Sequence, residues 1–565
     1  MWILGDWPEE ELATGAAGGV RLAVLGRHGA GNGRLHRHAR DIRTIADVDS
    51  VARTVDGSAH VMASVCGHVR IQGTVTGLRR VFSARLRHCT VAGDRPDVLA
   101  HLADADLDDE VLACHLLAPP MPSLVMSRSL WRGVHGLPTR DCLLLDTKGR
   151  AETRRWWRPP PPELPLSQGA GPFGEALNRA VGVRAAAARN VSSDLGGFDS
   201  TTLCCLAARH GPVVACTGGA DDPAADDLPW ARRTAATVPG ITHLELPLDQ
   251  LPDAYAGALD SDEPPDAPCP THVDRARFAA IWQAVAREHE PGVHFTGCGG
   301  DEIAGGTENH VYDMLRAPRS SWRTLRGFKA EARWSLRSML AMRRDRRPYG
   351  RWLAEELGGG LHLPGTPDAL PQPWGYPVRM PPWATPDAID FVRAALRRLA
   401  EENDPWSRYR GQHCDLDMMF ATAQEVRHHM RIAGRLGFAL AAPYYDDRVV
   451  EAGLAVRAEE RVTLWTYKPL LPAAVKGLVP DSVFARTTKA EGSHAQYTGW
   501  LAHRERLLAL CEDSRLAARG LIDARRLREA LGRPLSAFAD SHIFEPTIAC
   551  ETWLRTTPGT TERRP

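Results

Sequence analysis

Lysine is scarce in this sequence of 565 residues. Only five of its 69 basic side chains are lysines, so any lysine that chemistry requires is one of Lys148, Lys329, Lys468, Lys476 and Lys489. An excess of either charge is also missing, because 69 acidic residues balance the basic ones. Nucleic-acid binding needs basic side chains to neutralise phosphates, so this balance argues against a general nucleic-acid binder and leaves room for a local basic patch.

Long apolar runs are absent as well. No run reaches the roughly 18–20 residues needed to span a bilayer, and the N-terminus, MWILGDWPEEEL, has acids where a secretory signal has basic residues. The 12 cysteines are scattered and include no CxxC pair, which excludes a disulfide scaffold and disfavours a zinc site. We expect a cytoplasmic protein without membrane insertion, whose cysteines are reduced and mostly buried.

A proline-rich segment divides the chain. Trp156, Trp157 and Arg158 are followed by four prolines and then by a small, polar stretch that ends at Pro172. Because proline fixes the backbone and removes amide donors, this pattern predicts a stiff connector. We therefore expect a first domain over residues 1–155, a linker over 156–172 and a second domain over 173–565.

Short apolar runs and helical spacing indicate a layered α+β fold for the first domain. The expected strands lie near residues 20–25, 59–65, 68–72 and 142–146, and the expected helix covers 98–117. After residue 170 the pattern changes to an alternation of strands and helices, which favours a doubly wound parallel sheet. Its expected strands are 190–195, 213–217, 242–246 and 293–296, and its expected helices are 174–189, 200–209, 226–238 and 273–288. We expect the chain from about 305 onward to be mostly helical.

Residues 316–351 form a strongly basic stretch. It holds 12 arginines and lysines against two acids, interleaved with Trp322, Phe328, Trp334 and Tyr349. Such a stretch is typical of RNA-binding or acidic-peptide-binding segments. The alternative is a pair of amphipathic helices whose charges face water and whose aromatic rings face the core.

A glycine loop over residues 192–202 follows the first strand of the alternating region. Gly196 and Gly197 allow the backbone to approach an anion closely, and the helix that follows adds its positive end. The sequence therefore predicts a phosphate-binding loop. Asp199 would repel a phosphate unless a cation bridges them, so we assign it to Mg²⁺.

A second glycine loop, Thr296–Glu302, follows the fourth strand of this region. Ligands of open parallel sheets bind beyond the carboxyl ends of the strands, so both loops are expected at one edge, with Asp301 opposite Asp199. Two carboxylates near a polyphosphate imply metal-assisted nucleotide chemistry. The residues predicted to bind the nucleotide here are Leu195, Gly196, Gly197, Asp199, Ser200, Thr217, Gly297, Gly299 and Gly300.

Five segments then resemble motifs of one family in the right order. Segment 195–200 resembles the SGGxDS pyrophosphate loop of the asparagine-synthetase-like ATP pyrophosphatases, and 297–302 resembles their GxGxDE segment. The other three segments are 442–446, 468–471 and 486–493, which resemble the E-x-R-x-P-F-[LY]-D, K-x-[IL]-L and R-x-K-x-G elements. The resemblance implies a degenerate glutaminase-like (Ntn-type) α+β domain, then a doubly wound ATP-pyrophosphatase domain with a helical C-terminal part, using ATP and Mg²⁺.

Three departures from the motifs indicate a branch of that family. Trp2 replaces the cysteine nucleophile of glutamine-dependent members, Leu195 replaces the first serine of SGGxDS, and Ala439 falls where asparagine synthetases place a glutamate. These changes resemble the lasso-peptide macrolactam cyclases, especially the actinobacterial ones with a DLGGxDS loop. Beta-lactam synthetases share the degenerate N-terminus.

The resemblance identifies the bound nucleotide as ATP and adds Lys468 and Lys489 to the predicted ATP-binding residues. Lys489 matches the essential lysine that stabilises the adenylation and aminolysis transition states, and Asp199 and Asp301 hold Mg²⁺. Lys468 either contacts phosphate or forms a structural ion pair. The candidate substrate contacts are Tyr444, Tyr445, Asp446 and Glu263, although the tyrosines also suit packing. Glu263 and Asp266 belong to an acidic loop that either senses the amine of the peptide or is solvated.

The activity implied by the resemblance is macrolactam formation in a peptide. The enzyme would adenylate an Asp or Glu side chain of a leader-cleaved core peptide, and the N-terminal amine of the peptide would displace AMP. Its partners would be the precursor peptide, a leader peptidase and a leader-binding protein, with no nucleic acid. Three alternatives stay open: another amide-forming adenylating enzyme of the beta-lactam synthetase or ammonia-dependent asparagine synthetase kind, a catalytically dead peptide scaffold, and an RNA-modifying pyrophosphatase.

Overall fold

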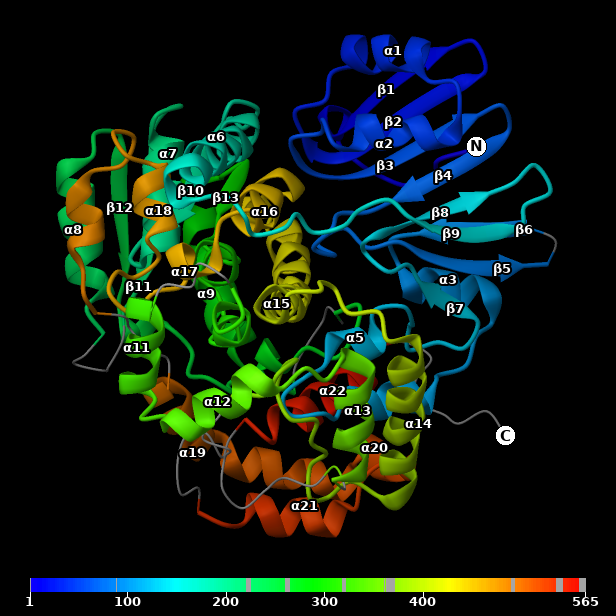
Figure 1. Ribbon diagram of the computed structural model, residues 1–565, viewed down its shortest axis with the longest axis vertical. Helices are drawn as coiled ribbons and strands as arrows, with labels where there is room; N and C mark the ends of the chain where they lie inside the picture. The colour runs from blue at the N-terminus through cyan, green and yellow to red at the C-terminus, as the bar shows by residue number, and fades with distance from the viewer. Residues whose placement is uncertain are drawn as a thin grey trace.

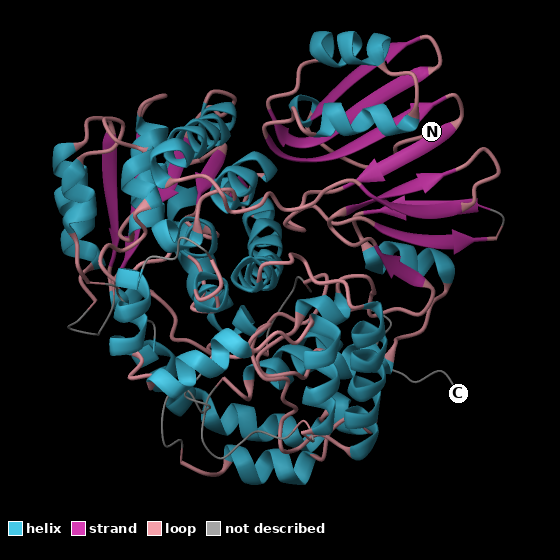
Figure 2. Cartoon of the chain, viewed as in Figure 1, coloured by secondary structure: helices cyan, strands magenta, loops and turns pink. Residues whose placement is uncertain are grey.

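The computed structural model describes residues 2–87, 89–219, 225–259, 265–317, 322–359, 361, 371–488, 493–534 and 542–557. Two sheets rich in antiparallel pairs occupy one side, a parallel sheet the other, and helices fill the region below both (Figures 1 and 2). No helix of the described residues is long and apolar enough to cross a membrane.

The N-terminal region is built on a six-stranded antiparallel sheet of order β1-β2-β3-β4-β8-β9. Its strands are β1 (Leu12–Ala17), β2 (Val20–His28), β3 (Gly57–Val65), β4 (His68–Gln72), β8 (Asp141–Leu145) and β9 (Ala151–Arg155). Helices α1 (Asn32–Asp41) and α2 (Val48–Ala52) pack on it through buried aliphatic residues such as Leu35 and Val51. The glutaminase-like character of this region stays a prediction.

A smaller sheet of order β6-β5-β7 adjoins the first one. Its elements are β5 (Phe82–Leu86), β6 (Cys89–Gly93) and β7 (Val134–Gly136), accompanied by α3 (Pro96–Ala103), α4 (Asp109–Cys114) and α5 (Pro122–Val125). The single helix expected over 98–117 is wrong. Asp104 adopts a left-handed conformation that ends α3, and the Asp108 side chain caps the new helix by accepting from the amides of Glu110 and Val111.

The predicted parallel sheet is confirmed, with strand order β12-β11-β10-β13-β14. Its strands are β10 (Val191–Asp194), β11 (Val213–Gly218), β12 (Ile241–Leu246), β13 (Val293–Phe295) and β14 (Ala439–Ala441). All neighbouring pairs are parallel. The chain runs outward from β10 to β12 and then returns to the other side of β10 with β13, so the order reverses between β10 and β13.

Strand β10 is polar, which is unusual for a central parallel strand. Its polar side chains find partners on the neighbouring strand β13. Ser192 Oγ lies 2.9 Å from His294 Nδ1, Asp194 Oδ1 lies 3.0 Å from His294 Nε2, and Ser193 Oγ donates to the Phe295 carbonyl. Hydrogen bonding satisfies these groups inside the sheet, so they can be buried.

Helix α6 (Leu166–Ala185) begins earlier than the sequence suggested. Residues 166–172 were expected as linker because they are rich in glycine and contain Pro172, yet they are helical. The small residues serve close packing: a Cβ on Gly169 would lie 2.5 Å from Val456, and one on Gly174 would overlap the carbonyl of Ala474. The other helices of the sheet are α7 (Phe198–Ala208), α8 (Asp227–Thr237) and α9 (Arg275–His289).

The chain after residue 305 is mostly helical, as predicted, apart from the short strand β14. The helices are α10 (His310–Met314), α11 (Trp322–Glu331), α12 (Leu336–Arg344), α13 (Tyr349–Gly358), α14 (Pro386–Glu402), α15 (Arg410–Arg435), α16 (Asp447–Leu454), α17 (Ala458–Arg461), α18 (Leu470–Ala474), α19 (Ser493–Ala509), α20 (Arg515–Ala518), α21 (Ala524–Leu531) and α22 (Glu545–Thr556). The N-terminal and C-terminal regions share a core, in which Trp131 packs edge-on against Trp553.

Candidate functional site

The two glycine loops meet at the carboxyl edge of the parallel sheet. One loop follows β10 and leads into α7, and the other follows β13 and leads into a π-helical turn, Asp301–Gly305. These strands are neighbours where the strand order reverses, which is the position at which open α/β sheets bind ligands.

Glycine is required where the loops touch. A Cβ on Gly297 would lie 2.6 Å from the Ser200 amide nitrogen, and one on Gly300 would come closer still to the Asp199 carboxyl. Gly299 adopts φ +92°, a conformation that favours glycine. The close approach holds the backbone of the second loop against the first turn of α7, where Asp199 lies.

Lys468 lies between the two acids predicted to bind Mg²⁺. Its ammonium pairs with Asp199, and its Nζ is 2.8 Å from Asp301 Oδ1. Burial alone would lower the pKa of Lys468, but the two carboxylates outweigh it and raise the pKa above the ordinary lysine value. The lysine therefore stays protonated and keeps two like-charged carboxylates close together.

Aromatic residues fix this cluster from two sides. Tyr467 donates from its hydroxyl to Asp301 Oδ1 at 3.1 Å, and its ring stacks edge-on against Phe198. Tyr444 donates to the carbonyl of Asp199 at 3.3 Å. Tyr444 and Tyr445 are both fully buried, so they pack beneath the site, which is the alternative that the sequence left open for them.

A buried carboxyl lies next to the cluster. Glu302 accepts a hydrogen bond from the Thr422 hydroxyl at 2.9 Å, and Thr422 lies 2.6 Å from the Tyr445 hydroxyl. Burial raises the pKa of Glu302, with the charges of Asp301 and Asp199 adding to the effect. Sequence reasoning included Glu302 in a motif and gave it no role, because its partner Thr422 is 120 positions away.

Arg486 anchors the segment that precedes Lys489. Its guanidinium pairs with Asp226 and Asp227 and also donates to the carbonyl of Gly196 at 3.0 Å. This contact fixes one peptide of the predicted phosphate-binding loop. Lys489 itself and Glu263 lie outside the described residues.

Leu195 removes a hydroxyl that the resembled loop has. Its backbone is held in the sheet, donating to Cys216 and accepting from the Thr217 hydroxyl at 2.6 Å. Of the neighbouring hydroxyl side chains, Ser193 and Thr201 are buried, whereas Ser200, which is predicted to bind ATP, is half-buried at the start of α7.

Two residues predicted as substrate contacts have structural partners instead. Asp446 accepts two hydrogen bonds from Arg184 at 2.6 and 2.7 Å, and both side chains are 2% exposed. Such a paired, buried carboxylate is unavailable to a substrate. Asp266, expected in a solvated or amine-sensing loop, is buried and pairs with Arg427 at 2.9 Å.

The residues present fit a magnesium ion. Asp199 and Asp301 supply carboxylate oxygens, which Mg²⁺ prefers, and the Asp301 side chain is 55% exposed and so reachable from solvent. A cation, the Lys468 ammonium, already bridges them. Asp199 and Asp301 would therefore hold Mg²⁺ together with phosphate oxygens of ATP.

Another group of possible metal ligands among the described residues is better explained as a polar cluster. It consists of Asp194, Cys216 and His294. His294 already lies within hydrogen-bond distance of Asp194 and Ser192, and burial raises the pKa of the Cys216 thiol well above its ordinary value. The cysteines are free, and all but Cys66, Cys89 and Cys298 are buried, as predicted.

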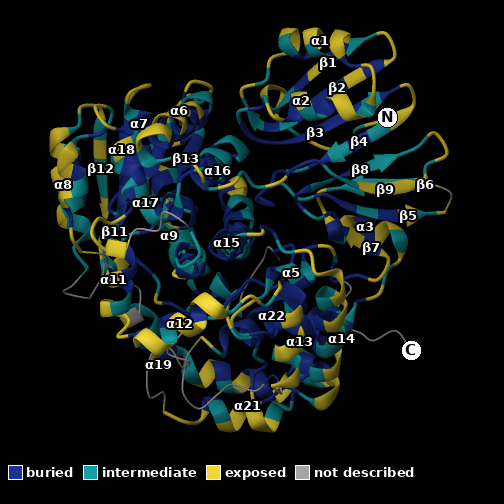
Figure 3. Cartoon of the chain, in the orientation of Figure 1, coloured by how far each residue is buried: buried dark blue, intermediate teal, exposed yellow. Residues whose placement is uncertain are grey.

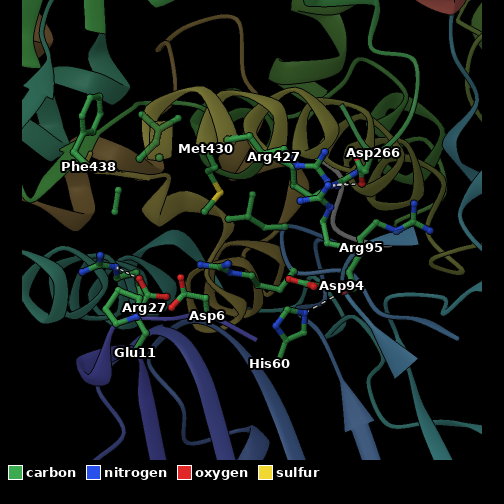
Figure 4. Close-up of a pocket in the computed structure, with 18 of the residues that line it drawn as sticks. Asp6, Glu11, Arg27, His60, Asp94, Arg95, Asp266, Arg427, Met430 and Phe438 are labelled. Carbon is green, nitrogen blue, oxygen red and sulfur yellow. Dashed lines mark hydrogen bonds and ion pairs between the residues drawn. The ribbon is translucent and has the colours of Figure 1, made fainter. Parts of the chain in front are cut away.

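A pocket of about 630 Å³ opens at the opposite edge of the parallel sheet. It lies beside Gly292, which directly precedes β13, and Ala439, the first residue of β14. Figure 4 shows Asp6, Glu11, Arg27 and His60 of the N-terminal region facing Arg427, Met430 and Phe438 across it. Two of its arginines form ion pairs within the pocket: Arg27 with Glu11 at 2.7 Å and Arg427 with Asp266. The pocket lies between two regions of the chain and away from the glycine loops.

The asparagine synthase family model matches residues 173–555, which is more than half of the chain. The chain belongs to the asparagine synthase family and is an ATP-dependent, amide-forming ligase by that membership. No curated protein sequence matches the chain closely. The family match covers both glycine loops, Lys468 and Arg486, so the site just described lies wholly within it.

Proposed function

We propose that this protein closes a macrolactam ring in lasso-peptide biosynthesis, in the cytoplasm. It adenylates an Asp or Glu side chain of a leader-cleaved core peptide, and the peptide's own N-terminal amine then displaces AMP. The observation that carries the proposal is that Asp199 and Asp301, on two glycine loops at the point where the strand order reverses, both pair with Lys468. A precursor peptide, a leader peptidase and a leader-binding protein are its proposed partners.

Sequence departures support this branch of amide-forming chemistry. Trp2 stands where glutamine-dependent enzymes have their nucleophile, so ammonia from glutamine is not the amine. Ala439 stands in place of the asparagine synthetase glutamate, which argues against a free ammonia acceptor as well. Both substitutions are consistent with a reaction in which the substrate itself carries the attacking amine.

The chain's residues prepare the first step by binding and orientation. Backbone amides of the loop at Gly196 and Gly197, together with the positive end of α7, bind the pyrophosphate part of ATP. The substrate carboxylate attacks the α-phosphorus, and the bond to the leaving pyrophosphate breaks. Mg²⁺, when bound, neutralises charge on the phosphate oxygens.

The second step forms the amide. The amine nitrogen attacks the acyl carbon, the bond to AMP breaks, and one proton leaves the nitrogen. Holding the amine and the acyl group of one peptide together makes the step intramolecular, where effective molarities reach about 10⁵–10⁸ M. We assign Lys489 to stabilise the negative charge of both transition states, since it follows a segment that Arg486 ties to the phosphate-binding loop.

Incubation with ATP, Mg²⁺ and the leader-cleaved core peptide tests the proposal. We expect pyrophosphate release and, by mass spectrometry, loss of one water from the peptide. Both signals should vanish in Lys489→Ala, whereas the matched variant Lys476→Ala, an exposed lysine, should retain them. Pyrophosphate release without water loss would overturn the cyclase assignment in favour of another adenylating enzyme.

Absence of ATP turnover with any peptide would instead favour the catalytically dead scaffold. Leu195 is the observation that favours this second candidate function, because it replaces a hydroxyl side chain of the phosphate-binding loop. Leu195→Ser distinguishes the two: in a scaffold that has lost only this contact it would restore turnover, and in an active cyclase it should change the rate little.

A further inference from the structure

A pocket of about 820 Å³ lies on the basic stretch, between α12 and the start of α15. Seven arginines line it: Arg316, Arg343, Arg344, Arg346, Arg347, Arg408 and Arg410. Asp313 is its one acidic lining residue. Figures 1 and 3 show α12 between α11 and α13, with exposed residues along much of its length.

A buried arginine forms part of this pocket. Arg410 is 4% exposed, and its guanidinium lies over the rings of Tyr312 and Trp374 at 5.0 and 5.2 Å from their centroids. Its Nη2 donates to the Arg347 carbonyl at 2.7 Å and pairs with Asp345 Oδ1 at 3.3 Å. Its Nη1 is buried and has no hydrogen-bond partner among the described residues. A guanidinium held this rigidly, with a donor left over, is prepared for an anionic acceptor.

The other lining arginines divide into paired and unpaired groups. Arg347 is neutralised by Asp345 and Glu355, and Arg316 donates to backbone carbonyls. Asp313 is occupied by the amides of Arg410 and Gly411 at the start of α15.

By contrast, Arg343, Arg344 and Arg346 are exposed, and none of them forms an ion pair with another described residue. The adjoining pocket of about 650 Å³ shares Arg344 and Arg346, so the positive surface continues around the end of α12. The net charge of the lining is therefore strongly positive where the chain as a whole is neutral.

We propose that this pocket binds an acidic peptide segment through its carboxylates. Planar guanidinium groups match carboxylates in bidentate fashion, and the volume is that of a ligand pocket rather than of a single ion site. RNA is the rival partner, but single-stranded RNA stacks its bases on exposed aromatic rings. The rings that border this pocket, Tyr312 and Trp374, are buried beneath Arg410.

The pocket's place along α15 links it to the catalytic edge. Arg410 begins α15, and Thr422, which hydrogen-bonds Glu302, lies 12 residues further along. A helix rises 1.5 Å per residue, so the separation along the axis is about 18 Å. An extended peptide covers that distance in about five or six residues. Identifying the acidic segment as part of the substrate peptide rests on the proposed function.

Fluorescence polarisation with labelled hexaglutamate tests the pocket directly on the full chain without ATP. We expect binding that weakens with added salt, and about tenfold or greater weakening in Arg344→Gln/Arg346→Gln. The control Arg37→Gln/Arg40→Gln removes two exposed arginines from α1 and should bind like the wild type. A third variant, Arg410→Lys, should also weaken binding, because an ammonium cannot reproduce the guanidinium geometry.

The proposal would be overturned by no hexaglutamate binding, by equal binding to Arg344→Gln/Arg346→Gln, or by tighter binding of an eight-nucleotide oligouridine than of hexaglutamate. The proposal would also be overturned if inorganic phosphate, compared at equal total negative charge, bound as tightly as hexaglutamate and displaced it. The pocket would then be a simple anion site. Binding of hexaglutamate does not depend on catalysis. A peptide cyclase that fails this test therefore keeps its proposed function, and a pocket that passes it stands even if no cyclisation is found.

Discussion

The two edges of the parallel sheet both carry clusters of paired charges, yet the backbone that holds the charges differs between them. At the carboxyl edge, Asp199 and Asp301 lie on glycine loops that bring main-chain amides and carboxylates together, and Lys468 pairs with both acids. At the amino edge, the pocket of Figure 4 brings Arg427 and Asp266 together between two regions of the chain. Both clusters are paired, so pairing alone does not separate a catalytic site from a structural one.

Exposure and topology make the distinction. Asp301 is half exposed and faces the place where the strand order reverses, so a metal and a nucleotide can reach it. Asp266 is 8% exposed and pairs with Arg427, whose side chain is 13% exposed, so the interaction contributes to stability rather than to binding. The comparison predicts that substitutions at the first edge change the rate and that substitutions at the second change the free energy of unfolding.

The largest effect is expected at Asp199. Asp199→Asn removes a metal ligand while keeping the shape, so pyrophosphate release should fall at least about a thousandfold. The melting temperature should change little, because Lys468 still pairs with Asp301. Asp390→Asn, on the exposed surface of α14, is the matched control and should keep full activity. Wild-type turnover by Asp199→Asn would contradict the metal assignment.

A smaller loss of rate is expected at Lys468. Lys468→Met removes the cation between the two acids, and we expect pyrophosphate release to fall about a hundredfold. Lys476→Met, at an exposed lysine eight positions away, provides the comparison under the same assay. Loss of melting temperature without loss of rate per folded molecule would show that Lys468 has only a structural role.

At the amino edge, Arg427→Met should act on stability. It leaves Asp266 buried with one fewer partner, which we expect to cost about 3 kcal/mol of unfolding free energy. Arg393→Met, which breaks the exposed pair with Asp390, should cost no more than about 0.5 kcal/mol. Denaturant unfolding measures both, and pyrophosphate release per folded molecule should stay at the wild-type rate. A large loss of that rate would remove the distinction between the edges.

The pH dependence of stability gives the smallest effect. Burial would raise the pKa of Asp266, but Arg427, Arg431 and Arg80 outweigh burial and lower the pKa to about 2. A carboxyl with a lowered pKa stabilises the fold above its ordinary pKa, and this contribution is lost as pH falls towards 2. Asp266→Asn should therefore cost about 2 kcal/mol at pH 7, with the difference from wild type shrinking below pH 4. An unchanged difference at pH 3 would contradict this ion-pair account.

Much of the sheet could be predicted from the sequence because its signals are local. Strands β11 and β13 and the glycine loops are set by short apolar runs and by glycines within a few residues. The start of α6 could not be predicted, because Gly169 and Gly174 are needed for close packing against Val456 and Ala474, about 300 positions further along the chain. Strand β14 is three residues long and is defined by its pairing with β13.

In the candidate site, too, features with local signals could be predicted and contacts between distant segments could not. Asp199 and Asp301 were predicted to face each other from strand order alone, and the structure brings them to one lysine. The link from Arg486 to Gly196 and the burial of Asp446 by Arg184 join distant segments, and no local pattern signals them. One of the two alternatives for the basic stretch placed its rings in the core. Phe328, Trp334 and Tyr349 are buried, whereas Trp322 is 67% exposed.

The central claim is that the carboxyl edge of the parallel sheet cleaves ATP between its α- and β-phosphates. Phosphorus NMR of a reaction with ATP, Mg²⁺ and the core peptide tests it most directly. The account predicts AMP and pyrophosphate in equal amounts, with neither formed by Asp199→Asn. Formation of ADP and inorganic phosphate, or equal product from Asp199→Asn, would contradict it.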